Sequence, residues 1–137
     1  MGEIPVNYET AMKQFYSKTV LDHGRNPRNL GDLEETNAFG IVTGHCGDTI
    51  GIWLKIEDNK IAEISFSTDG CMTLLAVGSM VTELAKGKSL TDAQNLCQQD
   101  ILDALGGLPE ESEHCALLAL DTLKEAIRNY QSMKRSP

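Results

Sequence analysis

The chain has 137 residues, 41% of them hydrophobic, which suits one compact domain around one core. Lys and Arg number 12 against 20 Asp and Glu, and no basic tract is long enough to follow a phosphate backbone, which argues against nucleic acid as a partner. No stretch approaches the roughly 20 apolar residues of a membrane span, and the N-terminus does not resemble an export signal. We therefore expect a cytoplasmic, single-domain protein over residues 1–137, with flexible ends at 1–7 and 131–137.

The first predicted element is an amphipathic helix. Apolar residues recur at helical spacing from Tyr8 to about His23, and Gly24 then marks the predicted stop. Residues 25–37 are rich in turn formers and acidic side chains, which is typical of a connector on the surface.

The pattern then changes to the period of two that is typical of strands. Two runs of alternating apolar residues flank a turn at 57–60, which predicts a β-hairpin with one apolar face, and 39–43 can add a third strand. The sheet is therefore expected to be small, antiparallel and covered by helices. The apolar positions of the hairpin are Ile50, Ile52, Leu54, Ile56, Ala62, Ile64 and Phe66.

Helices are expected in the second half. A dense apolar stretch after Cys71 ends at Lys86-Gly87 and predicts a helix half-buried on the sheet, followed by short helices around 89–96 and 100–105. A last helix should run from near Ser112 to about Tyr130. Its predicted inward stripe is Leu117, Leu120, Leu123, Ile127 and Tyr130. The expected fold is α+β, with a three-stranded antiparallel sheet packed against four to six helices.

Three cysteines, Cys46, Cys71 and Cys115, lie far apart, each in a short polar or glycine-bearing setting. A chain of this length with no export signal does not need disulfides, so free or metal-bound thiols are expected. Cys97 is interpreted as a small buried hydrophobe. His23 is interpreted as a favourable charge near the end of the first helix.

The flanking residues suggest how the thiols are activated. Asp69 is expected to cap the helix whose first turn holds Cys71, and Ser112 the helix whose first turn holds His114 and Cys115. Helix N-termini stabilise anions by ~0.3–1 kcal/mol, which favours thiolates at both places.

The remaining cysteine lies on a loop before a strand. Asp48 follows Cys46 by two residues and points to the same side of an extended chain, so both could reach one metal. Three thiolates with a fourth ligand from Asp48 or His114 fit a tetrahedral Zn²⁺ or a [2Fe-2S] cluster. Because a carboxylate is a hard ligand for a soft iron–sulfur centre, a cluster held through Asp48 should be labile. Two alternatives remain: Asp48 fixes a turn, and His114 is a neighbour of a helix cap.

These motifs carry a family resemblance over residues 8–130. Cys46-Gly-Asp48 opening a strand, Asp69-Gly-Cys71 opening a helix and His114-Cys115 opening the last helix, with Asp22-His23 and Pro27-Arg-Asn-Leu-Gly31 upstream, resemble the U-type iron–sulfur cluster assembly scaffolds, the IscU and NifU N-terminal family.

The resemblance implies a scaffold rather than a turnover enzyme. Such a scaffold accepts persulfide sulfur from a cysteine desulfurase, builds a [2Fe-2S] cluster with iron and electrons from a donor such as a ferredoxin, and transfers it to apo-proteins. By resemblance Cys46, Cys71 and Cys115 are the ligands, Cys115 is the favoured sulfur acceptor, Asp48 tunes release and His114 can serve as a ligand.

The chain also departs from the family. Leu108-Pro-Glu-Glu-Ser112 replaces the Leu-Pro-Pro-Val-Lys handle, which argues against a dedicated Hsp70-type chaperone. His45 stands where a small residue is usual and is a candidate extra ligand. The stretch from Gly87 to His114 is short for the insertion that marks the zinc-using branch of the family.

The sequence also allows functions other than that of a scaffold. One alternative is a zinc-binding sulfur acceptor of the same family. Two others are a zinc hydrolase or lyase with Asp48 as proton acceptor, and a structural zinc site in an interaction module.

Overall fold

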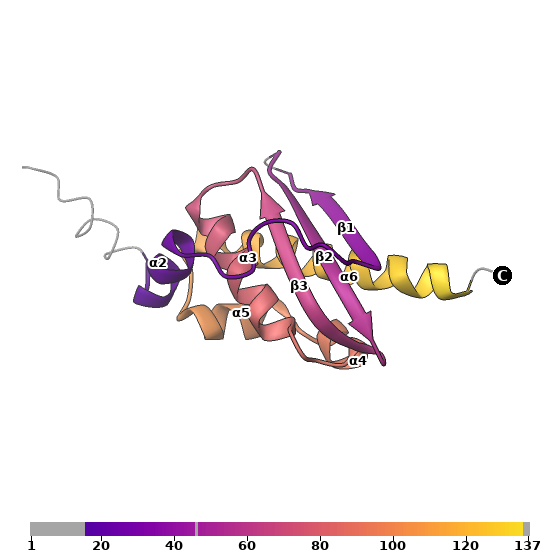
Figure 1. Ribbon diagram of the computed structural model, residues 1–137. Coiled ribbons are helices and arrows are strands. Elements are labelled where there is room, and N and C mark those ends of the chain that lie inside the picture. The colour runs from indigo at the N-terminus through magenta and orange to yellow at the C-terminus, as the bar shows by residue number, and fades with distance from the viewer. Residues whose placement is uncertain (1–15, 46, 136–137) are drawn as a thin grey trace, which may run out of the picture.

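A three-stranded sheet and a layer of helices make up the protein, whose computed structural model describes residues 16–45 and 47–135 (Figure 1). The strands β1 (Ala38–Thr43), β2 (Thr49–Glu57) and β3 (Lys60–Thr68) pair antiparallel in chain order. The helices in the described chain are α2 (Lys18–Arg25), α3 (Met72–Ala85), α4 (Leu90–Gln94), α5 (Gln98–Leu105) and α6 (His114–Arg135), with a 3₁₀ turn, η1, at Glu110–Ser112. The predicted α+β class and sheet are confirmed.

The β2–β3 hairpin follows the predicted pattern with one change of register. Asp58 and Asn59 both have positive φ, which matches the right-handed twist of the strands they join. The predicted apolar positions of β2 are buried, but a bulge between Lys55 and Ile56 shifts the pairing near the turn. Ile61 is therefore fully buried opposite Ile56, and the predicted core position Ala62 is only partly buried.

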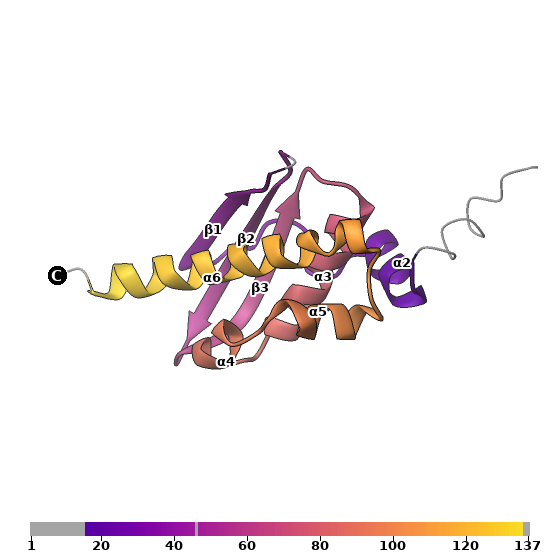
Figure 2. The same ribbon diagram turned by 180° about the vertical axis from the view of Figure 1, so that it is seen from behind.

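The helix α6 lies directly on β1 because Gly40 has no side chain. A Cβ at Gly40 would stand 2.7 Å from the nitrogen of Ala126 and 2.9 Å from the carbonyl oxygen of Thr122, closer than real Cβ atoms approach such atoms. In Figure 2 the helix crosses the sheet and continues past β1. The glycine thus sets the distance between the two layers.

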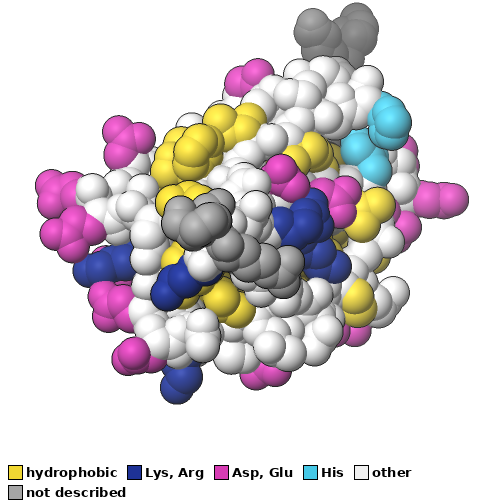
Figure 3. Space-filling model, turned by 90° about the vertical axis from the view of Figure 1, so that its right-hand side faces the viewer, with side chains coloured by type: hydrophobic (Ala, Val, Ile, Leu, Met, Phe, Trp, Pro, Cys, Tyr) yellow, Lys and Arg dark blue, Asp and Glu magenta, His cyan; other side chains and the backbone are white. Residues whose placement is uncertain are grey.

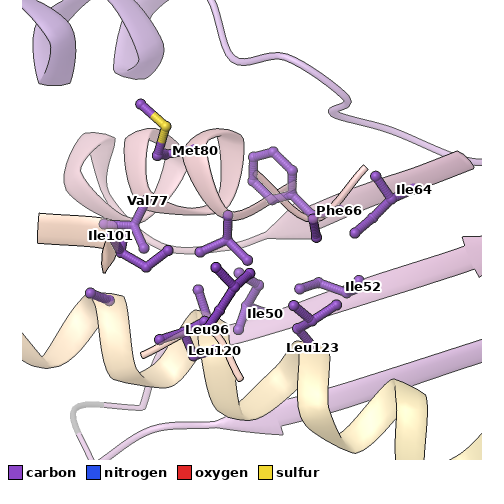
Figure 4. Packing of buried hydrophobic residues seen from close by; sticks show 14 of the residues in the cluster. Ile50, Ile52, Ile64, Phe66, Val77, Met80, Leu96, Ile101, Leu120 and Leu123 are labelled. Atoms are coloured by element: carbon purple, nitrogen blue, oxygen red, sulfur yellow. The ribbon is translucent and has the colours of Figure 1, made fainter. Parts of the chain in front are cut away.

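The helix α3 is more deeply buried than its pattern predicts. We expected a half-buried helix, yet ten of its residues, from Thr73 to Ala85, are buried. It packs against α2, β3, α5 and α6, so more than one side of it is covered. Figure 4 shows Val77 of this helix within the same cluster as Phe66 of the sheet and Leu120 of α6.

The first helix in the described chain differs from the prediction. Residues 8–15 lie outside the described part, and α2 begins after Ser17, whose side chain caps it by accepting a hydrogen bond from Val20 N. The helix passes through Gly24, where a Cβ would stand 2.5 Å from Met72 Cγ. This glycine therefore permits close packing of α2 on α3 and is not a helix stop.

His23 is also not a simple cap. It is 9% exposed, and its Nδ1 lies 2.6 Å from the hydroxyl of the fully buried Ser79, which also accepts a hydrogen bond from Arg28 N. Burial lowers the pKa of His23, and the Arg28 cation acts in the same direction. The imidazole is thus an internal link between α2 and α3.

One margin of the sheet is covered by the chain itself. Phe66 of β3 exchanges backbone hydrogen bonds with Asn29 and Gly31, and Ile61 does so with Gly87 and Lys88. The connector that contains residues 29–31 then crosses the outer face of β3 and β2 to reach β1 (Figure 1). The opposite margin is formed by β1.

The close approach at Gly40 predicts a large cost for one methyl group. Gly40→Ala should lower the free energy of unfolding by about 1–3 kcal/mol, because the new Cβ meets helix backbone that cannot rotate away. Urea unfolding measures this. Gly44→Ala is the matched control, since its Cβ would meet only the Leu118 side chain at 3.1 Å, and a similar loss in both variants would contradict the explanation.

The lowered pKa of His23 predicts loss of stability in acid. The unfolded chain, with a histidine pKa near 6.5, binds the proton more readily than the folded chain, so the free energy of unfolding should fall as the pH drops below that value. Urea unfolding at pH 7.5 and 5.5 tests this against His23→Asn, which cannot titrate. An equal pH dependence in both proteins would exclude His23 as the cause.

Candidate functional site

Three segments that carry cysteine residues in the sequence meet at one end of the molecule. The β1–β2 loop, the β3–α3 loop and the N-terminal end of α6 lie at the same end in Figures 1 and 2. Elements far apart in the chain thus bring the predicted ligand segments together.

Hydrogen bonds between backbone and side-chain groups tie two of these segments to each other. The N–H of Thr49, the first residue of β2, donates to Asp69 Oδ1 at 2.8 Å, and its carbonyl accepts from the Thr68 hydroxyl at 2.7 Å. The same hydroxyl accepts a hydrogen bond from Gly70 N at 3.0 Å. The segment before Cys71 is therefore fixed to the start of β2, one residue after Asp48.

Cys71 occupies a different position on its helix from the one predicted. It is itself the N-cap of α3, with extended backbone and no side-chain capping bond, and its thiol is exposed. Asp69 does not cap the helix, because its carboxylate is engaged with Thr49. The thiol thus makes no capping hydrogen bond to the helix, and it lies at the positive end of a 14-residue helix.

Cys115 is in the first turn of α6, as predicted, but it is buried. Its side chain is 7% exposed, and its Sγ lies 3.9 Å from Nε2 of the exposed His114. Ser112 does not cap this helix, because residues 110–112 form the 3₁₀ turn η1 before it. Of these two cysteines, one therefore opens to solvent and one is covered.

The loop between β1 and β2 is a tight connection. Gly44 N donates to the Asp48 carbonyl at 2.8 Å, and Gly47 N donates to the Gly44 carbonyl at 3.0 Å. Gly47 has a φ of +91°, which favours glycine. Cys46 lies outside the described residues, so the predicted common side of Cys46 and Asp48 stays a prediction.

A cavity of about 260 Å³ lies between this loop and α6. His45 and His114 both line it, together with Leu117, Leu118 and Asp121 of the helix. The histidine side chains on the face in Figure 3 gather at one corner. Leu117 is 48% exposed, so its predicted place in the inward stripe was wrong.

Sequence reasoning missed this helix face, although a signal was present. Positions three, four and seven after His114 share its side of a helix, and these are Leu117, Leu118 and Asp121. Apolar periodicity assigned Leu117 to the core, because it does not distinguish a core stripe from an apolar wall beside a polar site.

The described residues do not close a metal site by themselves. No group of three or more His, Cys, Asp or Glu side chains among residues 16–45 and 47–135 is arranged to hold one metal ion. The predicted ligands Asp48, Cys71, His114 and Cys115 belong to this part of the chain. A shared metal site therefore remains a prediction that also involves Cys46.

Cys97 was assigned wrongly as a buried hydrophobe. It is exposed and is the N-cap of α5, where its N–H donates to Asp100 Oδ2 at 3.0 Å and its Sγ lies 3.4 Å from the same oxygen. The backbone hydrogen bond, and next to it the thiol, lower the pKa of Asp100. Cys97 thus has a capping role.

These features define a class: a small α+β protein that gathers cysteine-bearing loops and helix N-termini at one end of a three-stranded sheet. Residues 15–136 match the family model described as "NifU-like N terminal domain". The chain belongs to this family.

Named relatives and solved structures agree with this assignment. The chain is 44% identical over 116 residues to the "Iron-sulfur cluster assembly scaffold protein IscU 1" of Archaeoglobus fulgidus, covering 84% of this chain and 76% of that protein. It is 40% identical over 126 residues to the scaffold protein IscU of Escherichia coli K12, covering 88% and 98%. A NifU-like N-terminal crystal structure from Brucella abortus superposes with a TM-score of 0.68 at 21% identity, covering 88% and 97%, and supports the fold.

The link between Asp69 and Thr49 predicts a measurable effect. Asp69→Ala should lower the free energy of unfolding by about 1 kcal/mol and speed hydrogen exchange at the Thr49 amide, because that N–H loses its acceptor. Asp69→Asn retains a carbonyl oxygen and should keep most of the protection. Unchanged exchange at Thr49 in Asp69→Ala would contradict the link.

Proposed function

We propose that the protein is a scaffold on which an iron–sulfur cluster is assembled and from which the cluster is transferred to apo-proteins. The observation that supports this most is the convergence of the β1–β2 loop, the β3–α3 loop and the start of α6 at one end of the fold. The names of the relatives at 37–44% identity point the same way.

The proposed ligands of the cluster are Cys46, Cys71 and Cys115, with Asp48 or His114 as the fourth. Thiolates are the usual ligands of a [2Fe-2S] cluster, and Cys71 and Cys115 both lie at helix N-termini, whose positive dipole ends suit an anionic cluster. The same donors suit Zn²⁺, which is the proposed occupant of the isolated protein when iron is absent.

Sulfur arrives in this proposal as a persulfide. The thiolate of Cys115 attacks the outer sulfur of a cysteine desulfurase persulfide, so that a new S–S bond forms at Cys115 and the thiolate of the desulfurase leaves. Each such sulfur then takes two electrons from a donor such as a ferredoxin to become sulfide. Because Cys115 is 7% exposed, the start of α6 must open for this step.

Asp48 is proposed to control release. A carboxylate oxygen is a harder donor than a thiolate and holds a soft iron–sulfur centre less firmly. Replacing it should therefore retain the cluster longer. The cluster is cargo in this scheme, so the protein acts as a carrier and not as a turnover enzyme.

The cellular setting is also part of the proposal. The partners are a cysteine desulfurase, an electron donor and apo-acceptor proteins, and the proposed location is the cytoplasm. None of the helices in the described chain combines the length and the apolar character that crossing a membrane requires.

The exposed Glu110 and Glu111 on η1 occupy the place of the chaperone handle, and we propose that a dedicated Hsp70-type chaperone does not bind there.

Anaerobic reconstitution tests the proposal. The full chain is incubated with iron, cysteine and a cysteine desulfurase, followed by visible absorption and Mössbauer spectra and by transfer to an apo-ferredoxin. Asp48→Ala should give a more persistent cluster and a slower transfer, because the weak ligand is gone. Asp92→Ala, an exposed carboxylate on α4 outside the site, is the control and should behave as the wild type.

Two outcomes decide against the proposal. Failure to form or transfer any cluster, with stoichiometric zinc and hydrolytic activity instead, would favour the zinc enzyme. An Asp48→Ala protein that holds less metal and shows no slower transfer would favour a structural zinc site. Cys97→Ser should assemble clusters normally, since Cys97 caps α5.

A further inference from the structure

The strand β1 is an edge strand, so the main-chain groups on its outer side are not used by the sheet. Gly44 N bonds to the Asp48 carbonyl, and by the alternation of antiparallel pairs Gly40 and Val42 also direct their N–H and C=O toward β2. Phe39, Ile41 and Thr43 then direct theirs away from the sheet. No further strand of the described chain pairs with this margin, because β1 is an edge strand of the sheet.

The helix α6 forms a wall along the same margin. Its Asn129 side chain donates to the outward carbonyl of Phe39 at 2.8 Å, and at the other end of β1 Leu117 and Leu118 approach Thr43 around the cavity of about 260 Å³. A second cavity, about 530 Å³, lies at the start of β1 between Phe39 and Met133. The two hollows thus lie near opposite ends of β1, each between that strand and α6, and we call this margin of β1 with its two hollows the groove.

Side chains in the groove are apolar at the Phe39 end, and a carboxylate lies at the histidine end. Phe39 and Met133 are 51% and 66% exposed, although both are large and hydrophobic. Asp121 is exposed beside the histidine end, and Glu125 pairs with Arg128 farther along the helix.

We propose that this groove binds an extended, cysteine-bearing segment of the apo-acceptor protein, which pairs with β1 as a fourth strand. This inference rests on the proposed scaffold function and adds the way in which an acceptor docks. An acceptor thiol must approach the cluster closely, and the groove ends at the cavity of His45 and His114 beside the cysteine loops. A strand paired with β1 is held by main-chain hydrogen bonds, whatever the rest of its sequence.

The geometry sets the sequence of the segment. From Thr43 to Phe39 is four residues, or about 13 Å along a strand. The segment should therefore carry its cysteine four positions from a large apolar residue that fills the hollow at Phe39 and Met133. The carboxylate of Asp121, which lines the histidine cavity, favours a basic or neutral side chain next to the cysteine of the segment.

Transfer is then a ligand exchange without change of oxidation state. A bond forms between iron and the acceptor thiol, and the bond between iron and a scaffold thiolate breaks. The proton of the acceptor thiol ends on the departing scaffold thiolate.

The Ile41→Pro variant tests the proposed pairing of the acceptor segment with β1. The outward N–H of Ile41 is removed, while the N–H groups of Gly40 and Val42, which pair with β2, remain, and proline is tolerated on edge strands. Cluster transfer to an apo-ferredoxin should slow about tenfold. Cluster loss to dithiothreitol, which needs no strand, should not change, and Ile41→Val is the control.

A second pair of variants probes the apolar end. Met133→Glu should slow transfer to the apo-ferredoxin, whereas Met133→Leu should not, and neither should alter loss to dithiothreitol. In addition, apo-ferredoxin should slow hydrogen exchange at the Phe39, Ile41 and Thr43 amides of the apo-scaffold, a measurement that needs no cluster.

The outcomes separate this inference from the scaffold function. Wild-type rates in Ile41→Pro and Met133→Glu, or unchanged exchange at the three amides, would overturn the docking site and leave the scaffold function intact. A wild-type chain that holds no cluster would overturn the scaffold function, and the exchange measurement would still decide whether the groove binds the acceptor. If Ile41→Pro does not fold, Met133→Glu and the exchange measurement decide.

Discussion

The absence of a side chain at Gly40 is the constraint on which the arrangement of the two layers depends. Because α6 rests on the backbone of β1 there, the 22-residue helix can span the sheet, and the functional residues at both of its ends extend beyond the sheet. Its first turn reaches the cysteine loops with His114 and Cys115. Its last turns overhang the margin of β1. A larger residue at position 40 would lift the helix and separate both regions from the sheet.

The candidate site combines one exposed and one covered thiol on rigid supports. Cys71 caps a helix that is buried on several sides, and its loop is held to β2 through Asp69. Cys115 is covered although it also begins a helix. Burial protects the thiol of Cys115 from oxidation, whereas the thiol of Cys71 is accessible to solvent. In the proposed sulfur transfer, the start of α6 is the element that has to open.

The sequence predicted the elements better than the contacts between them. Period-two alternation located the hairpin, and glycine located the end of α3, because these signals are local. The roles of Asp69, His23 and Cys97 were assigned wrongly, since each depends on a partner that sequence spacing does not reveal: Thr49, Ser79 and Asp100. Asp100 is only three residues from Cys97, but the sequence does not show whether Cys97 is buried or caps α5, because packing determines this. The ligand role of Cys46 stays a prediction.

The two margins of the sheet are unequal, and this has a consequence for self-association. The β3 margin is closed by residues 29–31 and 87–88 of the same chain. A fibril grows by adding strands at both sides of every copy, so each molecule needs two open edges. A sheet with a single open edge ends any such array after one addition. The protein can therefore leave β1 available to other chains without providing a template for endless polymerisation.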